Sequence, residues 1–251
     1  MTADEVTARL RARLTAGGYV PGERLGNERT LAAELGVPRG VLRTALDRLT
    51  ALGLVRRTIG RAGGVIASDG RIERHLNTTE SLPEIARYQG VQVDTRVLHA
   101  VLGLADAAEA RRLGLPEGAT VHRILRLRLA DGRPLSLEAS CLPADLFPGL
   151  DREDLSMLYR TLRERYGIGP VFSDETLEVV SADREQARHL AVPPGSALLH
   201  VQRVAAGSTG RPIELGQEWF VADRMRFHLR TYGYVTPGRP TRPPHPAAPP
   251  S

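Results

Sequence analysis

The sequence contains a single cysteine, no lysine and no long apolar run, and these scarcities exclude several classes of protein. One thiol, Cys141, cannot form an internal disulfide, which argues against a disulfide-rich secreted domain. No apolar run approaches the roughly 20 residues that a bilayer-crossing helix requires, and residues 1–14 are too polar for a signal peptide. We therefore expect a cytoplasmic protein with no membrane partner.

The sequence also lacks the residue spacings of metal centres and of common hydrolases. Its seven histidines are scattered, with no H-x-x-H or C-x-x-C spacing. It contains neither a G-x-S-x-G turn nor a Ser-His-Asp order. We therefore predict no metal, no cofactor and no catalytic residue.

All 34 basic residues are arginine, which a G+C-rich coding genome explains, but their distribution is uneven. Residues 1–70 hold 11 arginines against 7 acidic residues, whereas residues 71–235 hold 21 against 22. A basic N-terminal unit on a near-neutral body indicates a nucleic-acid partner for the first unit.

Two short helical patterns follow each other closely after Asn27, which is the expected N-cap of the first helix. Apolar residues three and four apart mark one buried face in residues 31–35 and one in residues 42–52, and Gly36 and Gly53 end them. Two helices separated by so tight a turn cross steeply, as in a helix-turn-helix. Two β-like runs, 54–58 and 64–67, flank a glycine-rich turn. Residues 1–70 are therefore predicted to form a winged helix-turn-helix domain.

This region resembles the DNA-binding domain of GntR-type bacterial regulators. The resemblance rests on the start PGERLGNERTLA, the recognition-helix segment RGVLRTAL and the wing turn GRAG, which occur in the family's order and spacing. It implies that the second helix enters the major groove of double-stranded DNA. Pro38 and Val41 replace a family Ser and Thr, which changes the expected operator sequence.

The predicted DNA contacts follow from that helix and wing. Arg39 and Arg43 can fork onto guanine, Val41 can touch a thymine methyl group, and Arg61 can reach the minor groove. For Arg29, Arg48 and Arg57, phosphate contact and plain solvation are equally good interpretations. The complete predicted set is Arg29, Arg39, Gly40, Val41, Arg43, Thr44, Arg48, Arg57, Arg61 and Gly63.

The rest of the chain predicts an α+β domain with a mainly antiparallel sheet. Residues 71–80 are the expected linker, part of which can pair as a strand, and residues 81–235 alternate strand and helix patterns. Asp131-Gly132 predicts a tight hairpin turn between two alternating runs. Residues 236–251 are proline-rich and are predicted to be a disordered tail.

This half resembles the UTRA effector-binding domain of the HutC branch of GntR regulators, which has a chorismate-lyase-like fold. The resemblance rests on an ordered set of segments, including RLRLADGRPLSLEASC, LAVPPGSALLHVQRV and GRPIELG. It implies a C-terminal domain that binds a small molecule and forms the dimer.

A candidate ligand site lies on the first hairpin. Arg126 and Arg128 share one strand face, and Glu138 lies on the returning strand, so the three can bind a small anionic, hydroxylated molecule. A surface ion-pair cluster is the alternative interpretation. The resemblance to amino-sugar-phosphate sensors also implies Tyr159, Glu214 and Phe220, and Ser81 begins a capped helix that can face an anion. Met157 and Phe220 replace polar family residues and make the expected pocket more apolar.

These observations predict a homodimeric, ligand-responsive repressor that binds a pseudo-palindromic operator. Two alternatives stay open: an enzymatic chorismate-lyase-like domain tethered to DNA, and a constitutive DNA-binding dimer without an effector.

Overall fold

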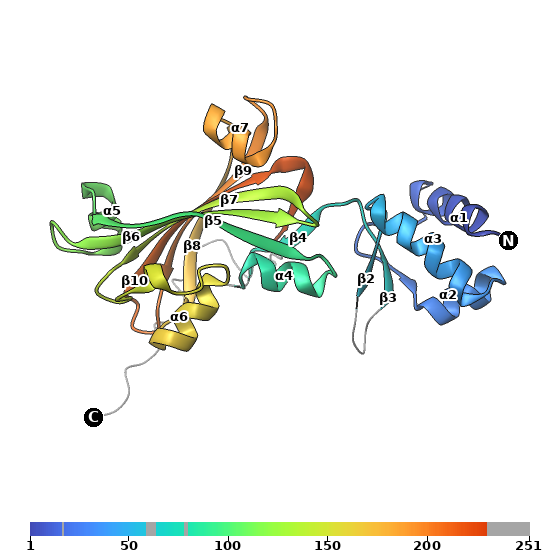
Figure 1. Cartoon of the computed structure of the whole chain (residues 1–251), viewed down its shortest axis with the longest axis horizontal. Helices are drawn as coiled ribbons and strands as arrows, with labels where there is room; N and C mark the ends of the chain where they lie inside the picture. The colour runs from blue at the N-terminus through green and yellow to red at the C-terminus, as the bar shows by residue number, and fades with distance from the viewer. Residues whose placement is uncertain (17, 59–63, 78–79, 230–251) are drawn as a thin grey trace, which may run out of the picture.

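The computed structural model describes residues 1–16, 18–58, 64–77 and 80–229, which form a small helical domain followed by a larger one built on a sheet (Figure 1). The tip of the expected wing and the expected tail, 236–251, lie outside the described residues. Within the described segments, every helix falls short of the length and apolarity needed to cross a membrane.

The N-terminal domain is a winged helix-turn-helix, as predicted. A three-stranded antiparallel sheet in the order β1-β3-β2 packs beside three helices. The elements are α1 (Ala3–Thr15), β1 (Arg24–Gly26), α2 (Glu28–Leu35), α3 (Arg39–Ala51), β2 (Val55–Thr58) and β3 (Gly64–Ala67). Strand β1 was not expected, because three residues are too few to show an alternating pattern.

Local chemistry fixes the ends of these helices. The Oδ1 atom of Asn27 accepts a hydrogen bond from the backbone N–H of Thr30 at 2.8 Å, which confirms Asn27 as the N-cap of α2. Gly36 ends α2 in the left-handed conformation at φ 64°, where glycine avoids the strain of a side chain. Helices α2 and α3 bury their apolar faces in one core, as the spacing of their apolar residues predicted.

The larger domain is built on one six-stranded antiparallel sheet with the order β5-β6-β7-β10-β9-β8. The predicted turn at Asp131-Gly132 is confirmed, with both residues at positive φ between β6 and β7. The sheet strands are β5 (Val93–Leu104), β6 (Thr120–Ala130), β7 (Arg133–Pro143), β8 (Phe172–Ser181), β9 (Ala197–Ala206) and β10 (Pro212–Val221).

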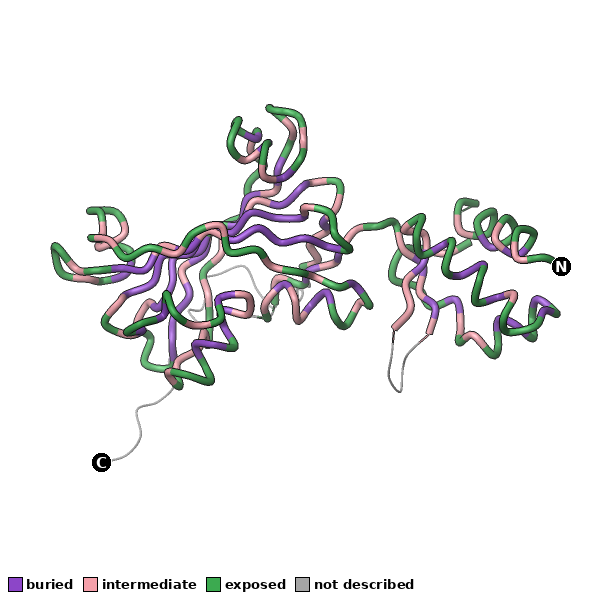
Figure 2. Tube along the Cα trace, viewed as in Figure 1, coloured by how far each residue is buried: buried purple, intermediate pink, exposed green. Residues whose placement is uncertain are grey.

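Helices cover both faces of this sheet, and its middle strands are the most deeply buried (Figures 1 and 2). On one face lie α4 (Leu82–Tyr88) and α6 (Leu158–Tyr166), and on the other lie α5 (Ala107–Leu113) and α7 (Arg184–Leu190). Two 3-10 turns, Leu150–Arg152 and Ala222–Arg224, complete the domain. The face under α4 and α6 carries a cluster of buried charged residues.

A second, two-stranded sheet joins the domain connection to the C-terminal part of the chain. Strand β4 (Ile72–His75) pairs in parallel with β11 (Met225–His228), which follows the last long strand. The connection between the domains is therefore anchored on the larger domain within a few residues of the winged domain.

The N-cap of α2 can be tested by substitution. Asn27→Ala removes the acceptor for the Thr30 amide, and we expect it to lower the free energy of unfolding by about 1 kcal/mol. Asn27→Asp keeps an acceptor at the positive end of the helix and should retain wild-type stability. Urea denaturation followed by circular dichroism measures both. Equal losses in the two variants would show that the cap does not stabilise the domain.

Candidate functional sites

The first candidate site is the exposed face of α3. Its apolar residues Leu42, Leu46 and Leu49 are fully buried, whereas Arg39, Gly40, Arg43, Thr44 and Arg48 are exposed. With 3.6 residues per helical turn, the exposed residues lie on one side of α3 and the buried leucines lie on the other. Val41 is half-buried and packs against the core, so it presents only part of its side chain. The hydroxyl of Thr44 donates a hydrogen bond to the carbonyl of Gly40 at 3.1 Å.

The arginines of this surface differ in the ion pairs and hydrogen bonds that they make within the protein. Within the described residues, the guanidinium groups of Arg29 and Arg39 have no ion pair or hydrogen bond. Arg43 lies 3.6 Å from Glu28, and Arg48 pairs with Asp4 of α1. Exposed pairs of this kind contribute about 0–1 kcal/mol, so a DNA phosphate can displace them.

Arg57 is engaged differently, because its side chain ties β2 to α3. It donates to Asp47 at 2.6 Å and to the carbonyl of Arg43 at 3.2 Å. This placement makes Arg57 an orienting contact between the wing strand and the recognition helix. The predicted wing contacts Arg61 and Gly63 lie outside the described residues.

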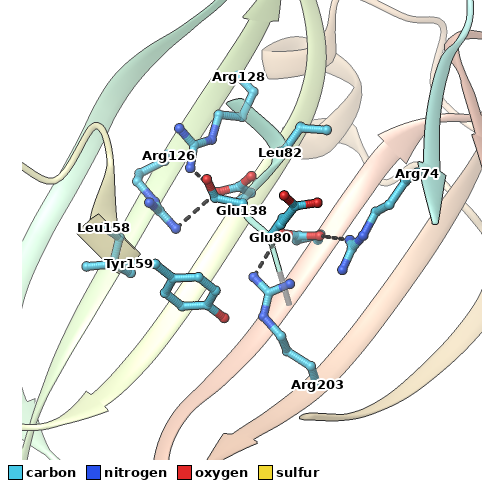
Figure 3. A pocket seen from close by; sticks show the side chains of 11 residues that line it. Arg74, Glu80, Leu82, Arg126, Arg128, Glu138, Leu158, Tyr159 and Arg203 are labelled. Atoms are coloured by element: carbon cyan, nitrogen blue, oxygen red, sulfur yellow. Dashed lines mark hydrogen bonds and ion pairs between the residues drawn. The ribbon is translucent and has the colours of Figure 1, made fainter. Parts of the chain in front are cut away.

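The second candidate site is a buried ionic pocket between the sheet and the first turn of α4. Figure 3 shows Arg126 and Arg128 beside Glu138, and Arg74 and Arg203 across the pocket from them. The lining residues are Arg74, Glu80, Ser81, Leu82, Arg126, Arg128, Glu138, Leu158, Tyr159, Arg203 and Glu218. Arg126, Arg128 and Glu138 are almost fully buried. They are therefore not the surface ion-pair cluster that the alternative interpretation described.

In one half of the pocket, two arginines share one carboxylate. The Oε2 atom of Glu138 lies 3.0 Å from Arg126 and 2.9 Å from Arg128. Arg126 also donates to the carbonyl of Leu155, and Arg128 donates to the carbonyl of Ser156. The Nε atoms of both arginines are buried without a hydrogen-bond partner among the described residues.

In the other half, Glu218 lies between two further arginines. It accepts from Arg74 at 2.6 Å and from Arg203 at 2.8 Å. Arg74 also pairs with Glu175 at 3.0 Å. A side chain at Gly216 would place its Cβ 2.7 Å from the Nε of Arg203, so glycine here lets the arginine lie across β10.

Glu214 lies behind this half and is fully buried. It accepts from Ser140 at 2.6 Å, from Tyr159 at 2.5 Å and from Arg203 at 3.3 Å. Burial alone would raise the pKa of Glu214, but its attraction to Arg203 and these hydrogen bonds outweigh burial and lower it. Burial raises the pKa of Tyr159 well above its ordinary value, so the phenol is a neutral donor.

Glu218 is ionised for the same reason. Burial opposes its charge, but Arg203 and Arg74 lower its pKa to about 2. The structure therefore holds several buried charges on one face of a sheet, each compensated by partners of opposite sign.

The structure brings most of the predicted effector residues together, but not all. Ser81, Arg126, Arg128, Glu138 and Tyr159 line the pocket. Glu214 lies one layer behind them, and Phe220 packs edge-on against Phe227 in the apolar core.

Sequence reasoning missed four charged lining residues, Arg74, Glu80, Arg203 and Glu218, and the apolar lining residues Leu82 and Leu158. A signal existed for two of them, because Arg203 and Glu218 interrupt the inward-facing apolar positions of β9 and β10. Arg74 gave no signal, since β4 is too short for its face to be predicted.

The open space within the pocket is small. Its volume is about 20 Å³, close to what a single water molecule needs. A ligand larger than water must therefore displace side chains or exchange partners with the internal ion pairs.

Comparison with known proteins identifies both domains. Residues 2–65 match the family described as bacterial regulatory proteins, gntR family, and residues 88–226 match the UTRA domain. The HTH-type regulator RB1450 of Rhizobium meliloti is 29% identical over 90% of this chain and 93% of its own length. The HTH-type transcriptional repressor NagR of Bacillus subtilis is 27% identical over 89% of this chain and 91% of its own.

A solved structure extends the similarity to the whole architecture. PhnF from Mycobacterium smegmatis superimposes with a TM-score of 0.65 at 27% identity, covering 91% of this chain and all of its own. These relatives are regulators of transcription rather than enzymes, and both domains of the family are present in the family's order. The chain belongs to the GntR family of bacterial transcriptional regulators, in the HutC branch, which pairs the DNA-binding domain with a UTRA effector-binding domain.

Proposed function

We propose that this regulator acts in the cytoplasm as a homodimeric repressor that leaves a pseudo-palindromic operator when a small molecule with an anionic group fills the ionic pocket. The observation that carries the proposal is the exposed, arginine-bearing face of α3 on a fold that also holds a buried arginine pocket. Two such faces in a dimer would meet successive major grooves about one helical turn apart.

Arg39 and Arg43 are the proposed base-reading residues. They lie in the first turns of α3, where a recognition helix meets base edges, and Arg39 has no competing partner among the described residues. Arg29 and Arg48 are proposed phosphate contacts, and Arg57 is proposed to hold α3 against the wing strand. Gly40, Val41 and Thr44 would complete the contact surface.

The proposed dimer uses the β8 edge of the large sheet. In the described residues this edge pairs with no other strand. Strand β8 exposes Phe172, Leu177 and Val179, and Val171 just before it is also exposed. An unpaired edge with exposed apolar side chains is a template for association. The opposite edge, β5, is interrupted by a bulge near Val97, which disfavours edge pairing there.

Helix α4 is the proposed connection between pocket and DNA-binding domain. Leu82 and the preceding Ser81 line the pocket at one end of the helix. At the other end, Gln89 accepts a hydrogen bond from Arg56 of β2 at 3.0 Å, and it also bonds the backbone of Glu73. A ligand that moves the first turn of α4 would therefore move a contact with the winged domain. A coupling of about 1–3 kcal/mol suffices for such a switch.

Gly90 makes this contact possible. Its φ is +72°, and a Cβ there would lie 2.3 Å from the carbonyl oxygen of Arg57, so only glycine lets α4 approach β2 so closely.

The DNA-binding surface is tested by removing both arginines. Arg39→Ala with Arg43→Ala should weaken operator binding by about 30-fold or more, because each forked contact to guanine contributes about 1–3 kcal/mol. Fluorescence anisotropy on the operator at fixed salt measures the affinity. Arg111→Ala with Arg112→Ala on α5 makes the same charge change away from α3 and should leave the affinity nearly unchanged. The proposal fails if the α3 variant folds and binds as tightly as this control.

The dimer interface is tested at the most exposed apolar residue of β8. Val179→Arg places a charge on the proposed contact. Because an unpaired charge resists burial, we expect the dissociation constant of the dimer to rise by at least about 10-fold. Val20→Arg introduces the same charge at an exposed valine of the winged domain and should leave the dimer intact. Sedimentation equilibrium distinguishes the two. A Val179→Arg protein that is still dimeric would place the interface elsewhere.

The contact between α4 and the winged domain is tested at Gly90. Gly90→Ala forces β2 away from α4, so we expect faster amide hydrogen exchange in residues 55–58 and 85–90. Gly114→Ala imposes similar backbone strain at φ +64° but meets no atom within 4 Å, so it controls for strain alone. Unchanged protection in Gly90→Ala would show that the contact does not hold the two domains together.

A further inference from the structure

A crevice lies between the two domains, beside the connection that Figure 1 shows running from one to the other. Pro21, Ile66 and Ala67 line it from the winged domain, and Glu73 of β4 and Tyr88 of α4 line it from the larger domain. Its volume is about 150 Å³, which is enough for one benzene-sized ring. It shares no lining residue with the ionic pocket, which lies at the opposite end of α4.

Most charged groups of this crevice already have partners within the protein. Arg226 pairs with Asp69, and its guanidinium also lies 3.3 Å from Glu73. Arg56 donates a hydrogen bond to the side chain of Gln89 at 3.0 Å. A positively charged ligand would therefore have to displace Arg226 from a carboxylate. A ligand with two negative charges would bring one of them close to Asp69 and Glu73.

Arg71 is the lining residue that keeps donors available. Its Nε donates to the carbonyl of Asp223 at 3.2 Å, which holds the guanidinium against the larger domain. Across the segments that the structure describes, its two terminal nitrogens have no hydrogen-bond partner. Two such nitrogens form a planar fork that matches one carboxylate. Because the side chain is 41% exposed, water screens part of this attraction.

The apolar lining comes from both domains. Pro21 is exposed and Ile66 is half-buried on the side of the winged domain. On the other side, Arg87 lies over the ring of Tyr88 at 5.6 Å, and Tyr88 is nevertheless 62% exposed. A ring that packs in the crevice would remove apolar surface of both walls from water, and contact between two aromatic rings adds to this gain.

We propose that this crevice is a second ligand site, separate from the ionic pocket, for a single planar ring that carries one carboxylate. The ring packs against Tyr88 of the larger domain and against Pro21 and Ile66 of the winged domain, and the carboxylate binds Arg71. Such a ligand contacts both domains at once. It therefore stabilises the arrangement in which the two domains touch.

The proposed site depends on the contact between α4 and β2. Arg56 and Gln89 line the crevice and bond to each other, and the next residue, Gly90, lies against the carbonyl of Arg57. A change that separates these residues would also separate the two walls. By thermodynamic reciprocity, a ligand that needs both walls strengthens the contact as much as the contact strengthens ligand binding.

Benzoate is the probe, and isothermal titration calorimetry on the full-length protein measures its binding. We expect a Kd of about 1 mM or lower. Benzyl alcohol, which lacks the carboxylate, and acetate, which lacks the ring, should each bind about 5-fold or more weakly, because each loses one of the two sets of contacts. The inference is overturned if benzoate does not bind at about 10 mM, or if either comparison compound binds as tightly.

Two variants assign the binding to this crevice. Arg71→Gln should weaken benzoate binding about 5-fold or more, and Tyr88→Ala should weaken it several-fold. Both side chains are partly or largely exposed, so neither substitution opens the core. Arg111→Gln on α5 removes the same charge elsewhere and should leave the affinity unchanged. Equal affinities in Arg71→Gln and Arg111→Gln would place the benzoate elsewhere and overturn the inference.

The bridging of the two domains has its own readouts. Gly90→Ala should weaken benzoate binding several-fold because it separates the walls, whereas Gly114→Ala should not. In the wild-type protein, benzoate should slow amide hydrogen exchange in residues 64–69 and 85–90 together. Slower exchange on one side only, or undiminished binding in Gly90→Ala, overturns the bridging. None of these measurements involves DNA, so their outcome is independent of the proposed repressor switch.

Discussion

The effector domain depends on one electrostatic constraint, the direct opposition of Glu138 and Glu218 on the neighbouring strands β7 and β10. Like charges facing each other across a sheet are destabilising, and burial makes the repulsion stronger. Four arginines from β4, β6 and β9 compensate these two carboxylates. Removing one partner would leave an uncompensated buried charge, which costs several kcal/mol, so the fold of this face depends on the same residues that line the proposed ligand pocket.

That constraint also joins the pocket to the rest of the molecule. Arg74 belongs to the strand that follows the winged domain by a few residues, and α4 runs from the pocket to the Arg56 contact on β2. Two connections therefore leave the pocket in the direction of the DNA-binding domain. These two connections are the contacts through which the proposed switch would act on the winged domain.

The arginines of the winged domain differ in how many contacts they make within the protein. Arg57 is held by Asp47 and the backbone of α3, whereas Arg39 projects from the same helix with no described partner. Arg57 therefore links β2 to α3, whereas the donors of Arg39 are left available, as the proposed DNA contact requires. The division follows from burial, because a guanidinium that is partly withdrawn from water requires protein partners.

The sequence by itself determined the elements and the residues that local geometry brings together. Helix and strand periods, the Asn27 cap and the Asp131-Gly132 turn predicted the winged domain and the first hairpin, and the hairpin register then placed Arg126 and Arg128 beside Glu138. Only the tertiary structure decided that Arg74, Arg203 and Glu218 complete the pocket and that Phe220 packs in the core. The physical reason is that alternation fixes which face a side chain occupies, whereas the pairing of strands far apart in sequence, such as β4 with β11, depends on the folded whole.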